Sequence, residues 1–192
     1  MAMILDGLAL SARVRAKVKQ RILEQRIKQG LAVILVGTDP ASHTYVGKKQ
    51  QACEEVGIRF EKYLYPAFVR DDELLLKIRH LNARKDVHGI LVQLPLPPWH
   101  DTNKIIGEIE PKKDVDGFHH FNLQRLKEGK PTIVSAVALA VMKLIDVNTS
   151  PHPSLKRGGI AAIISSDLFA QPLIELLKER AKDADLQKKP CI

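Results

Sequence analysis

Three polar side chains, Tyr45, Lys49 and Gln93, could together carry acid–base chemistry. Tyr45 and Lys49 are four residues apart, which places both on one face of a helix near its start. Gln93 is a lone amide in an otherwise apolar strand, and a buried amide must find hydrogen-bond partners. A lysine beside these two groups in a partly dry cleft can lose its proton near neutral pH, because desolvation disfavours the ammonium form. Such a lysine can serve as a general base or acid.

The same residues also allow an interpretation without chemistry. Lys48 and Lys49 would then be exposed lysines on a helix, Tyr45 a core residue and Gln93 a cap at the end of the sheet. Spacing alone leaves both interpretations open. They differ in one distance, because the catalytic interpretation requires Lys49 to lie within hydrogen-bond reach of Gln93.

Metal and redox chemistry have weaker support in the sequence. Residues 114–117 are typical of a turn rather than of a metal site, and His119 and His120 lack the spacing of a ligand pair, so we expect both to be loop residues. The two cysteines, Cys53 and Cys191, fit neither a disulfide framework nor a zinc motif. We therefore expect no metal site.

The hydrophobic pattern predicts the elements that would position the candidate site. Strands are expected at residues 31–36, 59–65 and 89–94, and helices at residues 8–30, 41–56, 71–81, 101–109 and 134–145. In the first helix, an apolar residue at every fourth position predicts one buried stripe, formed by Leu10, Val14, Val18 and Ile22.

Alternating strands and helices indicate right-handed βαβ units. The expected fold class is α/β, with a three-layer, parallel-sheet N-terminal domain. Ligands of such sheets bind beyond the carboxyl ends of the strands, so sites are expected in the loops after Val36, Leu94 and Ile164.

The C-terminal part of the sequence predicts less structure. Residues 149–154, rich in proline and serine, are expected to mark a domain boundary. Beyond them the pattern predicts a single βα unit, with a strand at 159–164 and a helix at 168–182. One βα unit cannot bury its own sheet, so we expect an incomplete second domain.

Composition narrows the class of partner. The chain has 192 residues, of which 45% are hydrophobic and 27% charged, and a formal net charge of +8. That size is enough for an ordinary core. The basic residues are spread along helices without interleaved aromatic residues, so we expect no dedicated nucleic-acid binding. No apolar run is long enough to span a membrane, and the opening residues reach Asp6 too early for a signal peptide, so we expect a cytoplasmic protein.

Several motifs, in order and correctly spaced over residues 4–126, resemble a known enzyme family. They are Tyr45-Val46-Gly47-Lys48-Lys49, then Gly89-Ile90-Leu91-Val92-Gln93-Leu94-Pro95, then Lys113-Asp114-Val115-Asp116-Gly117-Phe118-His119. The sequence resembles the bifunctional methylenetetrahydrofolate dehydrogenase/methenyltetrahydrofolate cyclohydrolase family. The resemblance implies a folate-binding catalytic domain at residues 1–125. It further implies a linking helix and a partial NADP-binding, Rossmann-like domain at 126–192.

The resemblance also implies roles for individual residues. Lys49 matches the catalytic acid/base, Tyr45 matches the tyrosine that packs on the folate ring, and Gln93 matches the glutamine that hydrogen-bonds the lysine. Asp116 matches the aspartate that binds the pterin edge. The implied substrates are tetrahydrofolate derivatives, the implied cofactor is NADP and the implied assembly is a homodimer.

The dinucleotide loop departs from the family pattern. Ile164, Ser165 and Ala170 stand where the family has glycine, arginine and glycine, and Ser166 is the remaining cofactor-binding candidate. Glycine lets the backbone approach a phosphate, and arginine can pair with one. The family's later strands also lack a counterpart in this sequence. We therefore expect cyclohydrolase activity to be retained in preference to NADP-dependent dehydrogenase activity; the alternative is a non-catalytic, truncated paralogue.

Overall fold

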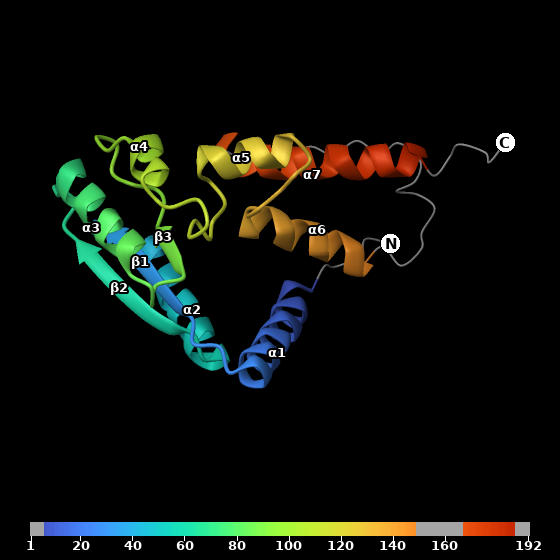
Figure 1. Cartoon of the computed structure of the whole chain (residues 1–192), viewed down its shortest axis with the longest axis horizontal. Helices are drawn as coiled ribbons and strands as arrows, with labels where there is room; N and C mark the ends of the chain where they lie inside the picture. The colour runs from blue at the N-terminus through green and yellow to red at the C-terminus, as the bar shows by residue number, and fades with distance from the viewer. Residues whose placement is uncertain (1–5, 149–166, 187–192) are drawn as a thin grey trace. The chain divides into compact units, whose positions relative to one another are not determined.

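The structure, a computed structural model, describes residues 6–148 and 167–186 (Figure 1). The chain divides into two compact units, one of which is Leu8–Val115. We call this the sheet unit. The described residues from Asp116 onward belong to the other, which we call the helical unit. The predicted functional division at residue 125 stays a prediction.

The sheet unit contains three parallel strands in the order β2-β1-β3. These are β1 (Gly30–Val36), β2 (Arg59–Tyr65) and β3 (Gly89–Val92). Ile34 of β1 pairs with Tyr63 on one side and with Val92 on the other. The prediction that the runs near residues 31 and 89 share one parallel sheet is therefore confirmed.

Helices cover both faces of this sheet: α2 (Pro40–Val56) on one, and α3 (Asp71–Ala83) with α4 (Thr102–Gly107) on the other. Side chains alternate along β1, so Val33 and Leu35 pack with Val46 of α2, as Leu91 of β3 does. Residues of the opposite face pack with α3 and α4; this larger core includes Ala32, Ile34, Ile90, Leu74, Ile78 and Ile105. The predicted three-layer α/β arrangement is confirmed.

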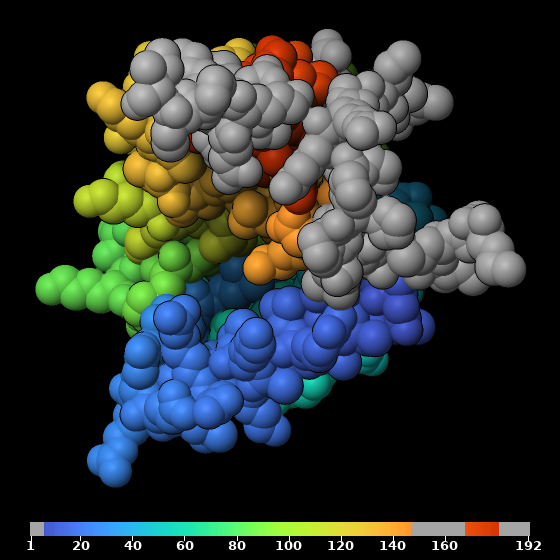
Figure 2. Space-filling model, turned by 90° about the vertical axis from the view of Figure 1, so that its right-hand side faces the viewer, coloured from blue at the N-terminus to red at the C-terminus, as the bar shows by residue number. Residues whose placement is uncertain are grey.

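One burial prediction is wrong. Helix α1 (Gly7–Gln25) forms where the periodicity places it, but none of its residues is buried. In the predicted stripe, Val14 is 38% exposed and Val18 36% exposed. The side chains of α1, blue in Figure 2, accordingly lie at the molecular surface. Amphipathic spacing indicates which face of a helix is apolar, but that face becomes buried only where a neighbouring element covers it.

The described part of the helical unit consists of α5 (His120–Lys127), α6 (Ala136–Asn148) and α7 (Asp167–Leu186). Helix α5 was not predicted, and the expectation of two loop histidines is wrong in part. The buried side chain of His119 caps α5 by accepting a hydrogen bond from the amide of Phe121 at 3.0 Å, and His120 is the first residue of the helix. The predicted boundary at 149–154, the predicted strand at 159–164 and Ser166 lie outside the described residues.

Two features that bear on function are absent from the described residues. None of the helices in 6–148 and 167–186 combines the length and apolar character needed to cross a membrane. Within the same ranges, no group of three or more histidine, cysteine, aspartate and glutamate side chains could hold a metal ion.

Candidate active site

The loop after β1 fixes the start of α2 at the carboxyl edge of the sheet. Gly37 adopts a left-handed φ of 85°, and its amide donates to the carbonyl of Tyr65 at 2.9 Å. Asp39 then caps α2, because its carboxylate accepts a hydrogen bond from the amide of Ser42 at 2.7 Å. This bond lowers the pKa of Asp39. The first turns of α2 are thus held beside the ends of the strands.

Lys49 lies on the inward stripe of α2. The buried residues of this helix are Ser42, Val46, Cys53 and Val56. Position 49 falls between Val46 and Cys53 at the spacing of the same stripe, so Lys49 faces the sheet although its neighbour Lys48 is exposed. A lysine at a position that elsewhere carries buried residues is unusual and requires a polar partner.

Gln93 is that partner. The Nζ atom of Lys49 donates to Oε1 of Gln93 at 2.9 Å. Gln93 is only 9% exposed, and its Nε2 atom donates to the carbonyl of Leu94 at 2.6 Å. Both ends of the amide are therefore used, which orients its oxygen toward the lysine. The backbone amide of Gln93 donates to Ile34 at 2.9 Å and so ties the residue to the sheet.

Tyr45 lies one helical turn before Lys49 and is 60% exposed. It is therefore not a core residue, and the interpretation of this group as purely structural is wrong in that respect. Its ring is available to stack on a planar ligand, while the Nζ atom of Lys49 provides a hydrogen-bond donor on the same helix. The described geometry thus brings Lys49 and Gln93 together and leaves an aromatic ring open beside them.

Asp116 follows a short segment that runs along β3. Within the sheet unit, the amide of Ile90 donates to the carbonyl of Lys113 at 2.7 Å, and Ile90 forms a parallel bridge with Asp114. Asp116 itself is half-buried and belongs to the helical unit. Its participation in one site with Tyr45, Lys49 and Gln93 stays a prediction.

Two residues with clear contacts were not singled out from the sequence. Lys113 was expected only as part of a motif, but its Nζ atom donates to three backbone carbonyls. The buried His100 was not noticed; its Nδ1 atom lies 2.6 Å from Oδ1 of Asp71 and lowers the pKa of that carboxyl. No sequence signal connects residues 29 positions apart.

A cluster of ion pairs lies elsewhere in the sheet unit, at the amino-terminal half of β2. Arg84 pairs with Glu61 at 2.7 Å and with Asp86 at 2.6 Å. The hydrogen bonds from Arg84, together with one from Tyr63, lower the pKa of Glu61 to about 2. This cluster joins β2 to the loop between α3 and β3, so we assign it to stability rather than to chemistry.

Comparisons with known proteins identify the family to which the chain belongs. Residues 5–116 match the family described as tetrahydrofolate dehydrogenase/cyclohydrolase, catalytic domain. The chain is 41% identical to the bifunctional protein FolD of Nautilia profundicola, covering 91% of this chain and 61% of that protein. It is 46% identical to the bifunctional protein FolD of Geobacillus thermodenitrificans, covering 94% and 64%. The chain therefore spans less than two thirds of the length of these relatives.

Solved structures give the same picture. The bifunctional enzyme FolD, a methylenetetrahydrofolate dehydrogenase/cyclohydrolase, from Campylobacter jejuni superposes with a TM-score of 0.76 at 38% identity, covering 90% of this chain and 63% of that one. The dehydrogenase-cyclohydrolase of Trypanosoma brucei, complexed with NADP cofactor and inhibitor, also gives 0.76, at 29% identity and with coverages of 91% and 61%.

Proposed function

The chain belongs to the tetrahydrofolate dehydrogenase/cyclohydrolase family, and on that premise we propose that it acts in one-carbon folate metabolism as a methenyltetrahydrofolate cyclohydrolase. The observation that carries the proposal is the bond of 2.9 Å between Lys49 and Gln93 at the carboxyl edge of the sheet. This hydrogen bond pairs a lysine on the sheet-facing stripe of α2 with a buried side-chain amide. These contacts favour a catalytic chain over a non-catalytic paralogue.

The reaction requires proton transfer and no hydride. Water adds to the methenyl carbon of 5,10-methenyltetrahydrofolate, a carbon–oxygen bond forms, and the bond from that carbon to N5 breaks to give 10-formyltetrahydrofolate. Of the two water protons, one ends on N5 and one is released. Lys49 moves these protons as general base and acid, while Gln93 orients its Nζ atom through Oε1.

Two further residues would bind the substrate. Tyr45, 60% exposed beside Lys49, would stack on the folate ring and orient it over the lysine. Asp116 would accept hydrogen bonds from the edge of the pterin. We propose tetrahydrofolate derivatives as the substrate class on this basis. A homodimer remains a proposal from the family resemblance, and a cytoplasmic location remains a proposal from the sequence.

The described residues do not fit NADP well. The start of α7 is used in packing: Ala170 is 7% exposed, and the ring of Phe169 contacts that of Phe118 at 4.9 Å between centroids. A phosphate-binding turn needs glycine at the position of Ala170, because a side chain there keeps the backbone away from the phosphate. We therefore propose that the dehydrogenase reaction of the family is weak or absent in this chain.

The test follows the loss of methenyl absorbance in two lysine variants. Lys49→Met should reduce the rate to that of the uncatalysed reaction, because the methionine side chain can neither take up nor donate a proton. Lys48→Met is the matched control, since Lys48 is the adjacent, exposed lysine of the same helix, and its rate should stay close to wild type. Turnover by Lys49→Met at the wild-type rate would exclude Lys49 as the acid/base and with it the proposed mechanism.

A further inference from the structure

Lys113 makes an unusual set of contacts for a lysine. Its Nζ atom donates to three backbone carbonyls at the end of α3: those of Leu81 at 3.2 Å, Asn82 at 2.8 Å and Arg84 at 2.8 Å. An ammonium group has three donors, and all three are used here. The side chain is directed into a helix terminus rather than into water.

The chemistry of a helix end explains these contacts. The last carbonyls of an α-helix lack partners within the helix, and together they carry a partial negative charge. A cation that reaches them satisfies the carbonyls and interacts favourably with the helix dipole. Lys113 does this from a segment 29 to 32 residues away in the chain, so it ties two distant segments together.

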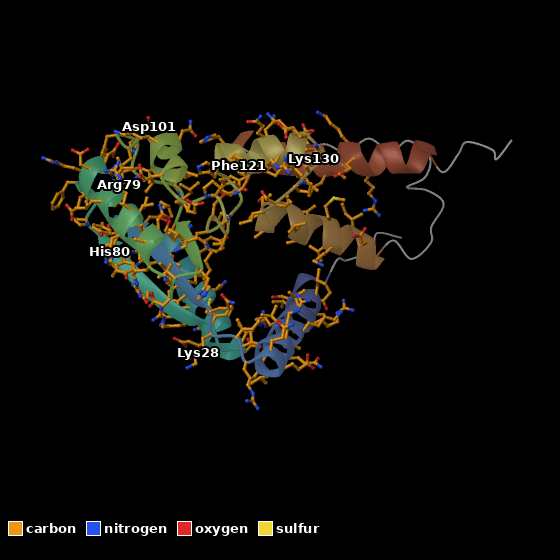
Figure 3. The ribbon with its side chains drawn as sticks, viewed as in Figure 1. Lys28, Arg79, His80, Asp101, Phe121 and Lys130 are labelled. Atoms are coloured by element: carbon orange, nitrogen blue, oxygen red, sulfur yellow. The ribbon has the colours of Figure 1, made fainter. Side chains whose placement is uncertain are left out.

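Two side chains of α3 hold the same region from the other side. Asn82 donates through Nδ2 to the carbonyl of Glu108 at 2.8 Å and accepts through Oδ1 from the amide of Glu110 at 2.9 Å. Arg79, labelled on α3 in Figure 3, pairs with the carboxylate of Glu108 at 2.8 Å. Lys113 therefore closes a set of contacts that fixes residues 108–113 against the end of α3.

These contacts determine where the next residues lie along β3. The amide of Ile90 donates to the carbonyl of Lys113 itself at 2.7 Å, and the parallel bridge between Ile90 and Asp114 follows. Residues 113–115 pack closely against β3, because a Cβ atom at Gly89 would lie only 2.5 Å from Cγ1 of Val115. Since residues 113–115 run parallel to β3, their carboxyl end is directed toward the edge that carries Gln93, and the chain continues from there into Asp116.

We propose that Lys113 is a positioning residue for substrate binding: its three hydrogen bonds to the end of α3 fix the segment that leads into Asp116. The inference rests on the proposed function, in which Asp116 binds the pterin. Lys113 would set KM for the folate, whereas Lys49 sets kcat.

The first measurement tests the placement without any ligand. In Lys113→Met, the amide of Ile90 should exchange with deuterium at least about tenfold faster than in wild type, because its acceptor is no longer held in place. The amide of Gln93 is the internal control, since it bonds to Ile34 on the other side of β3. Unchanged exchange at Ile90, or equal acceleration at Ile90 and Gln93, would overturn the placement.

The second measurement tests the effect on substrate. Lys113→Met should raise KM for methenyltetrahydrofolate roughly tenfold, the loss expected when hydrogen bonds to a charged group are removed, with kcat within about threefold of wild type. Leu75→Ala is the matched control for lost stability, since Leu75 is a core residue of α3 that is 5% exposed and touches none of these contacts. It should lower the melting temperature and leave KM unchanged.

A conservative variant keeps the test valid if Lys113→Met does not fold. Lys113→Arg retains the charge, but its planar guanidinium cannot direct donors at three carbonyls from one point, so KM should lie between those of wild type and Lys113→Met. A wild-type KM in Lys113→Arg, or in Lys113→Met where that variant folds, would overturn the inference and leave the proposed function standing. Absence of turnover in wild type itself would overturn the proposed function, and the inference with it.

Discussion

The hydrogen bond between Lys49 and Gln93 should appear as a measurable coupling in the stability of the sheet unit. We consider Lys49→Met, Gln93→Met and the double variant, because methionine matches both side chains in length and lacks their polar groups. In each single variant, the remaining polar side chain has lost its hydrogen-bond partner, which lies 2.9 Å away in wild type. The site is largely buried, since Gln93 is only 9% exposed. Loss of one partner of a buried polar pair costs about 1–3 kcal/mol, whereas replacement of both by apolar groups can be nearly neutral.

The double variant should therefore be more stable than the sum of the two single changes predicts. We expect a coupling free energy of about 1.5 kcal/mol, the lower end of the range for a hydrogen bond to a charged group, because Lys49 is only half-buried. With a urea dependence of about 1–3 kcal/mol/M, this coupling corresponds to a midpoint difference of about 0.5–1.5 M.

Urea unfolding followed by tryptophan fluorescence measures this coupling. The chain has one tryptophan, Trp99, and it lies in the sheet unit with both partners, so the signal reports the relevant unit. A matched cycle with Lys48→Met and Gln93→Met should show no coupling, since Lys48 is exposed. A coupling below about 0.3 kcal/mol in the Lys49 cycle, within the range of independent sites, would refute the claim that the two side chains interact in solution.

Three further predictions follow from contacts already described. Arg84→Met should destabilise the protein most above the unfolded pKa of glutamate. Arg84, with Tyr63, lowers the pKa of Glu61 in the folded protein to about 2, so the stability that this pair provides is lost as the pH falls through that value. If the difference in unfolding free energy between wild type and Arg84→Met grew on acidification, this reasoning would be contradicted. Gly89→Ala should cost about 1–3 kcal/mol in urea unfolding through overlap with Val115, and Val115→Ala should recover part of it; additive effects would exclude the overlap. Calorimetric titration with NADP should detect no binding by the chain alone, whereas micromolar binding would show that the start of α7 accommodates a phosphate.

Much of the sheet unit could be predicted from the sequence, because its local signals agree with its packing. Strand β2 has the predicted bounds, and α2 begins one residue before the predicted start at 41 and ends at the predicted residue, Val56. The strands form one parallel sheet because the alternation of elements leaves few other topologies. Residue spacing alone left the contact between Lys49 and Gln93 open; it was predicted from the family resemblance together with the rule that ligand sites lie at the carboxyl edge of such sheets.

The failures have two physical origins: contacts between residues far apart in the chain, and an element too short to give a clear periodic signal. The exposure of Val14 and Val18 depends on what covers α1, which periodicity does not specify. Helix α5 is only eight residues long and begins with a histidine cap, and so short a helix has a weak periodic signal. The three carbonyls that bind Lys113 come from the end of α3, far away in the chain, and nothing in the local sequence identifies them.

The position of Lys49 gives the most direct argument from structure to function. A helix built for stability alone would place an apolar residue between Val46 and Cys53, since that position faces the sheet. Here it holds a lysine whose ammonium must be satisfied by Gln93, itself a polar residue at the end of an apolar strand. Two departures from the local pattern, 44 residues apart, meet in one hydrogen bond. Neither departure is explained by packing, and together they are what a proton-transfer site at the edge of this sheet requires.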